Sequence, residues 1–459
     1  MRNILARVFD RPAQEKNSFS PETPLDFSLD SLSWIYDFWN SLSPYAYARL
    51  EDETIILPPN LVYRTNATGV QLLDFISRGG RIEEIPGFSF QRVREIEEFF
   101  ISLKNAYLGV PQSLEKVAFD FQFTKLPVLG EIALTYRCNN RCLFCYAGCG
   151  GELSDSSEAE LTTDELKKII TLFKEKAKIP FFSFTGGEPL LREDLEELCS
   201  FALSIGLRIN LITNGTLASP ERSRSLKKAG LSTAQVSLES PEALLHDKLC
   251  GAPGAYQKTL QGIEALQDAG IQVQTNSTLT RINQDSLLLM PAFIRQLGVK
   301  RFSMNLFIPT GSGKNAHDLM VPYVQTGDWV DQVRKNAHRE NLEFYWYSPT
   351  PLCIYNPIAR GMGNKACAAC DGLLSVSPQG DVLPCSSWKE PVGNLLREEF
   401  SSIWFGKKAQ WFKNKDYAPE NCQKCSSFSA CQAACPLYWE AIGYAELHPH
   451  WKNTVETGV

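Results

Sequence analysis

Short apolar segments alternate regularly with amphipathic ones from Glu131 onward, and this alternation decides the fold class. Alternating strands and helices form parallel βα units, because each helix must bury its apolar face against a sheet. We place the strands at 131–135, 180–184, 208–212, 234–238, 271–279 and 301–308. The pattern predicts an α/β protein with a partial (β/α)6 TIM-like barrel, whose chemistry is carried by loops that follow the strand C-termini.

The segments on either side of this barrel differ in character. Residues 1–110 contain no clustered cysteine and are predicted to form a small α+β unit with helices at about 67–76 and 90–105. From about residue 350 the alternation is lost and cysteines become frequent. We therefore expect a domain over 1–110, a linker over 111–130, the barrel over 131–345, a cysteine-rich domain over 346–440 and a tail over 441–459.

Charge and apolar content exclude two classes of partner. The 459 residues have a net charge of -6 and no cluster of five or more Lys or Arg, which argues against nucleic acid and anionic membranes. No run reaches the roughly 18 apolar residues of a membrane span, and the first residues lack an apolar stretch of signal-peptide length. We expect a cytoplasmic protein, in which the clustering of 14 cysteines indicates metal binding or catalysis.

The first cysteine group follows the first predicted strand. Cys138, Cys142 and Cys145 form a C-x-x-x-C-x-x-C loop. Three thiolates can hold a 4Fe-4S cluster and leave one iron open, whereas a closed zinc site requires four protein ligands. Cys149 is the candidate fourth ligand, so structural zinc is the alternative interpretation. Cys199 falls on the apolar face of a predicted helix and is assigned to the core.

This cysteine spacing resembles the signature of the radical S-adenosylmethionine (SAM) superfamily. The resemblance continues in FTGGEP, ITNG and VSLES, which follow the second, third and fourth predicted strands. It implies that SAM contacts Phe144, Thr185, Gly186, Gly187, Glu188, Thr213, Asn214, Ser237 and Glu239. Cys250 departs from the pattern, because the family usually carries Arg before the following Gly. No catalytic side chain is assigned.

Some of these motifs also have ordinary structural interpretations. Gly-Gly before Glu can be only a turn, and Ser237 and Glu239 can cap a strand end. The segment from Asn305 to Gly313 resembles the substrate-side loop of the pyrroloquinoline quinone biosynthesis radical enzyme, although it could equally be a plain glycine-rich loop. If FTGGEP contacts SAM, as the resemblance implies, its glycines allow backbone carbonyls to approach the ligand.

The second cysteine group resembles the SPASM extension of radical SAM enzymes, which holds auxiliary iron-sulfur clusters. Its members are Cys353, Cys367, Cys370, Cys385, Cys422, Cys425, Cys431 and Cys435. By the resemblance, Cys370, Cys385 and Cys435 bind one cluster with either Cys353 or Cys367, while Cys422, Cys425 and Cys431 bind the other. The family's usual last cysteine is missing, which leaves Glu440, Glu446, His448, His450 or an open iron in its place. Zinc ribbons are the alternative.

Residues 50–110 resemble the winged-helix-like recognition element of peptide-modifying radical enzymes, in which a strand edge can pair with a leader peptide. The resemblances together imply an enzyme with a SAM-binding 4Fe-4S cluster and one or two auxiliary clusters. Such an enzyme cleaves SAM to a 5'-deoxyadenosyl radical, takes a hydrogen from a precursor peptide and forms a C-C, thioether or related cross-link. Its electron donor would be flavodoxin or ferredoxin. The alternatives are formylglycine-forming or tetrapyrrole-modifying maturation, and a non-catalytic metal-cluster scaffold.

Overall fold

The computed structural model describes residues 32–43, 46–57, 61–85, 89–117, 124–149 and 159–451. By its internal contacts the chain divides into two compact units, Met1–Ala118 and Phe119–Val459. Residues 1–31 of the predicted N-terminal domain, residues 118–123 of the predicted linker and residues 452–459 of the predicted tail lie outside the described residues. The boundary between a barrel and a separate cysteine-rich domain at residue 345 stays a prediction.

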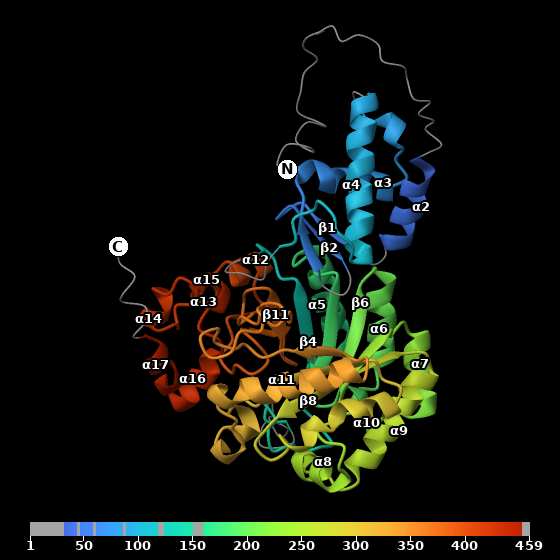
Figure 1. Ribbon diagram of the computed structural model, residues 1–459. Helices are drawn as coiled ribbons and strands as arrows, with labels where there is room; N and C mark the ends of the chain where they lie inside the picture. The colour runs from blue at the N-terminus through green and yellow to red at the C-terminus, as the bar shows by residue number, and fades with distance from the viewer. Residues whose placement is uncertain are drawn as a thin grey trace. The chain divides into compact units, whose positions relative to one another are not determined.

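The smaller unit combines an antiparallel sheet of order β1-β2-β3 with helices, as predicted for a small α+β unit (Figure 1). Its elements are α2 (Ser33–Leu42), β1 (Tyr47–Arg49), β2 (Thr54–Leu57), β3 (Leu61–Arg64), α3 (Ala67–Ser77), η2 (Ile82–Glu84) and α4 (Phe90–Leu108). Asn66 caps α3 by accepting the Gly69 N–H at 2.8 Å. Trp39 packs edge-on against Phe100 in the buried core.

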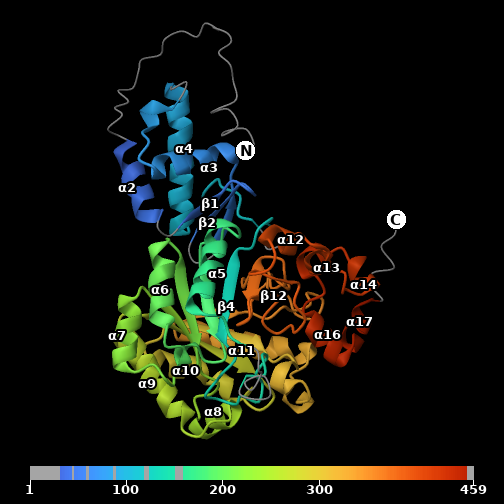
Figure 2. The ribbon, with the colours of Figure 1, turned by 180° about the vertical axis from the view of Figure 1, so that it is seen from behind.

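The larger unit is built on one curved sheet of order β10-β9-β8-β7-β6-β5-β4-β11-β12-β13 (Figure 2). The barrel strands are β4 (Leu129–Thr135), β5 (Phe181–Gly186), β6 (Arg208–Thr213), β7 (Thr233–Ser237), β8 (Gln272–Leu279) and β9 (Arg301–Leu306). All six pair in parallel, and they lie where the alternation predicted them. A further parallel strand, β10 (Glu343–Trp346), extends the sheet beyond β9.

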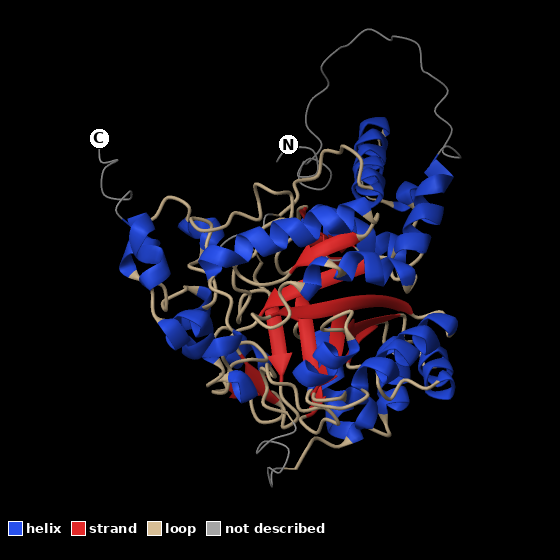
Figure 3. Ribbon diagram, turned by 60° about the horizontal axis from the view of Figure 1, so that its bottom comes forward, coloured by secondary structure: helices blue, strands red, loops and turns tan. Residues whose placement is uncertain are grey.

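The barrel helices lie on the outer side of this sheet (Figure 3). They are α5 (Thr163–Glu175), α6 (Leu195–Ser204), α7 (Pro220–Lys228), α8 (Ala243–Cys250), α9 (Ala255–Asp268), α10 (Met290–Gln296) and α11 (Tyr323–Arg339), with short turns η3 (Pro189–Leu191), η4 (Ser286–Leu288), η5 (Gly311–Gly313) and η6 (His317–Leu319). Helix α5 illustrates the pattern, because Thr162 and Glu165 form a capping box. Its apolar face, Leu166, Ile169, Ile170 and Phe173, is buried.

The cysteine-rich segment continues the barrel sheet. Strand β11 (Leu373–Val376) pairs in parallel with β4, and β12 (Asp381–Leu383) and β13 (Gly393–Asn394) follow it in antiparallel register. Short helices complete it: α12 (Phe400–Trp404), α13 (Lys407–Lys413), α14 (Glu420–Gln423), α15 (Phe428–Cys431), α16 (Pro436–Ile442), η7 (Ala445–Leu447) and α17 (His448–Trp451). Among the helices in the described ranges, none is long and apolar enough to cross a membrane.

Candidate functional site

The loop that carries Cys138, Cys142 and Cys145 follows β4 and is held by backbone contacts on two sides. On one side, the Arg141 N–H donates to the Cys250 carbonyl and the Leu143 N–H to the Leu249 carbonyl, each at 2.9 Å, at the end of α8. On the other side, the Ser312 N–H donates to the Cys145 carbonyl at 2.9 Å. The glycine-rich loop from Asn305 to Gly313 therefore lies directly against the cysteine loop.

The buried carboxylate of Glu188 ties the ends of β5 and β6 together. It accepts hydrogen bonds from the Leu190 N–H at 3.0 Å, the Thr213 hydroxyl at 2.7 Å and the Asn214 N–H at 2.8 Å. Burial raises the pKa of Glu188, and these three donors oppose that increase. Glu188 and Thr213 were predicted to contact a cofactor, and in this structure they bond to each other.

Gly186 and Gly187 allow β5 to approach the β4 end closely. A Cβ on Gly186 would lie 2.2 Å from the Thr135 carbonyl oxygen, and one on Gly187 would lie 2.1 Å from the Arg137 carbonyl oxygen. The Gly187 N–H also donates to the Thr135 carbonyl at 2.7 Å. The glycines thus make room for the neighbouring backbone just before Cys138. The sequence interpretation had expected a ligand to occupy that room.

The other predicted contact residues surround the same loop. The Asn214 side-chain amide donates to the Asn139 side chain at 2.9 Å and reaches Cys138 Sγ at 4.0 Å. The Thr185 and Tyr146 hydroxyls are 3.5 Å apart. Phe144 packs against the barrel core, and Ser237 is half-buried at the C-terminal end of β7. The expected residues from four strand ends are therefore gathered at one end of the sheet.

Glu239 is buried beside this gathering and is held by its neighbours. Its carboxylate accepts the Thr278 N–H at 2.7 Å, and its own N–H donates to His246 Nδ1 at 3.1 Å. Burial raises the pKa of Glu239 to about 7. Its negative charge also contributes to the raised pKa of Cys142, which places the carboxylate near the cysteine loop.

The three thiols of the loop occupy different electrostatic environments. A hydrogen bond from the Cys149 thiol is the largest cause that lowers the pKa of Cys145 to about 6. Hydrogen bonding with Cys250, followed by burial, raises the pKa of Cys142 well above its ordinary value. Burial raises the pKa of Cys138 to about 12. In the described part of the chain, no three His, Cys, Asp or Glu side chains form a group that could hold a single metal ion.

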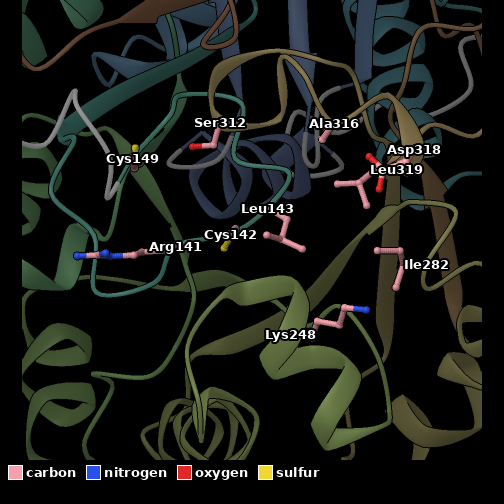
Figure 4. Close-up of a pocket in the computed structure, with 10 residues that line it drawn as sticks. All are labelled: Arg141, Cys142, Leu143, Cys149, Lys248, Ile282, Ser312, Ala316, Asp318 and Leu319. Carbon is pink, nitrogen blue, oxygen red and sulfur yellow. The ribbon is translucent and has the colours of Figure 1, made fainter.

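A cavity of about 430 Å³ opens beside the loop (Figure 4). Cys142, Leu143 and Cys149 line it from the cysteine loop, Lys248 from α8, and Ser312 and Asp318 from the segment that follows β9. Ile282 and Leu319 add apolar surface. The cavity therefore offers two cations, Arg141 and Lys248, together with one carboxylate and an apolar wall next to the thiols.

The C-terminal cysteines form two groups. Cys367, Cys370 and Cys385 pack together with Ala409 and Phe412. Charges at Cys367 and Cys435 contribute to the raised pKa of Cys385, which indicates that Cys435 lies near this group, while its side chain packs in the main core of the larger unit. In the second group, Cys422, Cys425 and Cys431 influence one another electrostatically.

Several residues around these sites were missed by the sequence analysis. Cys149 was considered only as the fourth ligand of a zinc site and Cys250 only as a departure from the family pattern, yet each hydrogen bonds to one of the loop thiols. Lys415 and Asp371 form a fully buried ion pair of 2.9 Å beside Cys370. Of these residues, only Cys149 could have been found from the sequence, because it lies close to the cysteine motif. Lys415 and Asp371 could not, because in a sequence a buried ion pair looks the same as ordinary surface charge.

Replacement of Glu188 by Gln is expected to lower the free energy of unfolding by about 1–3 kcal/mol, because an amide NH2 would face buried N–H and O–H donors. Urea denaturation followed by tryptophan fluorescence measures the difference. The matched control is Glu193→Gln, since Glu193 is exposed on the same β5–α6 connection. Equal stability of both variants would contradict the structural role of the Glu188 carboxylate.

Comparison with known proteins gives two family matches. Residues 132–288 match the radical SAM superfamily, and residues 367–426 match SPASM, an iron-sulfur cluster-binding domain. The AdoMet-dependent heme synthase of Methanosarcina barkeri is 30% identical over 346 residues, which cover 71% of this chain and 97% of that protein. The PqqA peptide cyclase of Streptomyces rochei is 29% identical over 320 residues, covering 66% of this chain and 83% of that protein.

The crystal structure of Streptococcus suis SuiB bound to its precursor peptide SuiA has a similar fold. It aligns with a TM-score of 0.65 at 15% identity and covers 86% of this chain and 95% of that chain. This likeness confirms the predicted fold class. The aligned 86% of this chain is longer than the unit Phe119–Val459, so the alignment also includes part of the smaller unit.

Proposed function

This chain belongs to the radical SAM superfamily, and from that membership we propose that it modifies a ribosomally made precursor peptide by hydrogen-atom abstraction and cross-linking. The observation that carries the choice of substrate is the separate N-terminal α+β unit, Met1–Ala118, attached to the barrel unit. Among its relatives, the PqqA peptide cyclase is named for action on a peptide. An additional folded unit that recognises a leader would supply the substrate contact that such a reaction needs.

The family's cofactors are SAM and iron-sulfur clusters, which when bound supply electron transfer and hydrogen-atom abstraction. We assign Cys138, Cys142 and Cys145 as the ligands of the SAM-binding 4Fe-4S cluster. The donor set fits, because backbone N–H groups point at its sulfurs: Asn140 at 3.5 Å from Cys138 Sγ and Cys149 at 3.3 Å from Cys145 Sγ. Such donors stabilise thiolates, the form that binds iron.

The protein's own contribution is to fix the loop and shape the space beside it. The strand-end contacts of Gly187 and Glu188 position the segment before Cys138, and those of Gly251 and Gly311 position the segment after it; a Cβ on Gly251 would lie 2.2 Å from the Arg141 carbonyl oxygen. Leu143, Ile282 and Leu319 limit water in the adjoining cavity. We propose that Asn214, Ser237 and Glu239 face SAM, with Phe144, Thr185 and Thr213 in the surrounding shell.

The smaller unit offers a candidate surface for the leader peptide. The outer edge of β3 is already paired, since the Val117 N–H donates to the Val62 carbonyl and the Arg64 N–H to the Glu115 carbonyl, both at 2.8 Å. Apolar side chains are exposed nearby in sequence, at the end of α4: Tyr107 is 48% and Leu108 is 59% exposed. We propose that these side chains contact the leader and that residues 115–117 yield the β3 edge to it.

Replacement of Tyr107 and Leu108 together by Ser is expected to weaken binding of the precursor peptide by about 10-fold, because apolar anchors carry most of such binding energy. A peptide encoded by a short reading frame beside the gene would serve as the probe, and fluorescence anisotropy would measure its affinity. SAM cleavage without peptide should be unchanged. The matched control is Leu203→Ser, since Leu203 is 50% exposed on the barrel helix α6. Equal peptide affinity in both variants would contradict this surface.

Tetrapyrrole modification is the second candidate, favoured by the relatives named heme synthases. The Methanosarcina barkeri protein is matched over 97% of its length. Titration with an iron porphyrin, followed by its absorbance, separates the candidates. The peptide proposal expects no saturable porphyrin binding together with saturable peptide binding, and the opposite pair of results would support tetrapyrrole modification.

A further inference from the structure

The first group of C-terminal cysteines is complete with four members. The Cys370 N–H donates to the carbonyl of Pro384, the residue before Cys385, at 3.0 Å. Cys367 lies in the same buried cluster as Cys370 and Cys385, and it influences Cys435 electrostatically. A 4Fe-4S cluster takes four thiolates. This group therefore needs no ligand from Cys353, although the sequence left Cys353 and Cys367 as alternatives for it.

Cys353 lies in a tight turn that contacts the second group. The Ile354 and Tyr355 N–H groups both donate to the Pro351 carbonyl at 3.0 Å, which closes the turn. The Leu352 N–H donates to Cys431 Sγ at 3.3 Å. The turn is thus fixed against a sulfur of the second group by the residue directly before Cys353.

The surroundings of the Cys353 thiol agree with this placement. Cys353 is itself exposed, and the thiols of Cys431, Cys422 and Cys425 lie close enough to influence it electrostatically. All three are members of the second group. That group has only three cysteines of its own in the C-x-x-C-x-x-x-x-x-C run that precedes Cys435.

The other candidates for the vacant position are Glu446, Glu440, His448 and His450, of which His450 is half-buried on α17. Both oxygens of the Glu446 carboxylate accept hydrogen bonds, one from the Tyr438 hydroxyl and one from the Val324 N–H. Glu440 is exposed on α16. His448 packs against the Trp451 ring with centroids 4.6 Å apart, and Trp451 hydrogen bonds to Cys422. His448 is therefore a competitor that is linked to the group through Trp451.

We propose that Cys353 supplies the fourth thiolate of the second auxiliary cluster, together with Cys422, Cys425 and Cys431. The ligand that the family usually takes from downstream comes in this chain from upstream, in the connection between β10 and β11. This inference rests on the SPASM part of the proposed function. It also predicts that the second auxiliary cluster has no open iron and no histidine ligand.

The test measures iron and sulfide content and the EPR spectrum of the reduced, reconstituted full-length protein. Its background carries Cys138→Ala, Cys142→Ala and Cys145→Ala, so that only auxiliary clusters contribute. Addition of Cys353→Ala is expected to remove about four irons per chain, or to change the EPR signal of one cluster if it retains iron. Cys199→Ala is the matched control, since Cys199 is buried within α6, and it should leave both readouts unchanged.

Paired variants assign the cluster to which Cys353 belongs. Cys353→Ala added to Cys422→Ala should cause no further loss, whereas Cys353→Ala added to Cys367→Ala should remove the remaining iron. Unchanged iron and EPR in the Cys353→Ala protein, or a changed EPR signal from His448→Ala in its place, would overturn the proposal. Absence of auxiliary iron before any of these changes would overturn the SPASM assignment itself, so the two failures are distinguishable.

Discussion

Simultaneous replacement of Cys138, Cys142 and Cys145 by Ala is expected to reduce SAM cleavage to background while auxiliary iron stays bound. The three thiols are the only protein ligands assigned to the SAM-binding cluster, and Cys149 is the one cysteine that then remains on the loop between β4 and α5. Cys149 is buried and serves as a hydrogen-bond donor to Cys145. Removal of all three ligands therefore removes the cluster and with it the reduction of SAM.

The measurement is 5'-deoxyadenosine formation under reducing, anaerobic conditions, with iron content determined on the same samples. Cys199→Ala is again the control for loss of a buried cysteine, and it should cleave SAM at the unaltered rate. Continued cleavage by the triple variant would show that the active cluster lies elsewhere. Loss of all iron, including the auxiliary share, would show that the two cluster regions depend on each other.

Replacement of Lys415 by Met is expected to lower the free energy of unfolding by about 3–5 kcal/mol, because it leaves the buried Asp371 carboxylate without its cation. The ammonium is 2.9 Å from Asp371 Oδ2 and donates to the Cys367 carbonyl at 3.0 Å. Loss of the second contact frees the backbone of Cys367, which we propose as a cluster ligand. The variant should therefore also bind less auxiliary iron than the unaltered protein.

A second change separates the ion pair from mere packing. Asp371→Asn added to Lys415→Met should recover much of the lost stability, since the buried Asp371 carboxylate that lost its ion-pair partner is then neutral. Lys424→Met is the matched control: its ion pair with Glu420 is exposed, and its loss should cost at most about 1 kcal/mol. Urea denaturation compares all four proteins. A loss in Lys415→Met no larger than in the control would contradict the importance of the buried pair.

The barrel was predictable from the sequence because its signals are local. The predicted strand 208–212 corresponds to β6, Arg208–Thr213, and the predicted strand 234–238 corresponds to β7, Thr233–Ser237. Strand β10 and the pairing of β11 with β4 were not predicted. Strands of four residues are too short to show a clear period, and pairing between distant segments leaves no mark in either of them.

The site was predictable in its members but not in their contacts. The motifs brought Cys138, Glu188 and Asn214 to one end of the sheet, as expected. They did not reveal that the Glu188 carboxylate accepts hydrogen bonds from the end of the neighbouring strand. The same motif residues can either contact a ligand or hold two strand ends together, and the sequence does not distinguish these roles. Cysteine spacing likewise could not decide whether Cys353 or Cys367 joins Cys370, Cys385 and Cys435, since the distance between these thiols depends on how the intervening chain folds.

The parallel pairing of β4 with β11 has a consequence for how the chain reaches its fold. Glu131 in β4 accepts a hydrogen bond from the Ser375 hydroxyl at 2.7 Å, across most of the barrel sequence. During synthesis, β4 therefore emerges with one edge unpaired and stays so until the cysteine-rich segment follows it. Such distant pairing slows folding, and an open strand edge promotes self-association in the meantime. The strand that leads into the first cysteine loop is completed late, and a chain shortened before β11 would keep that edge exposed.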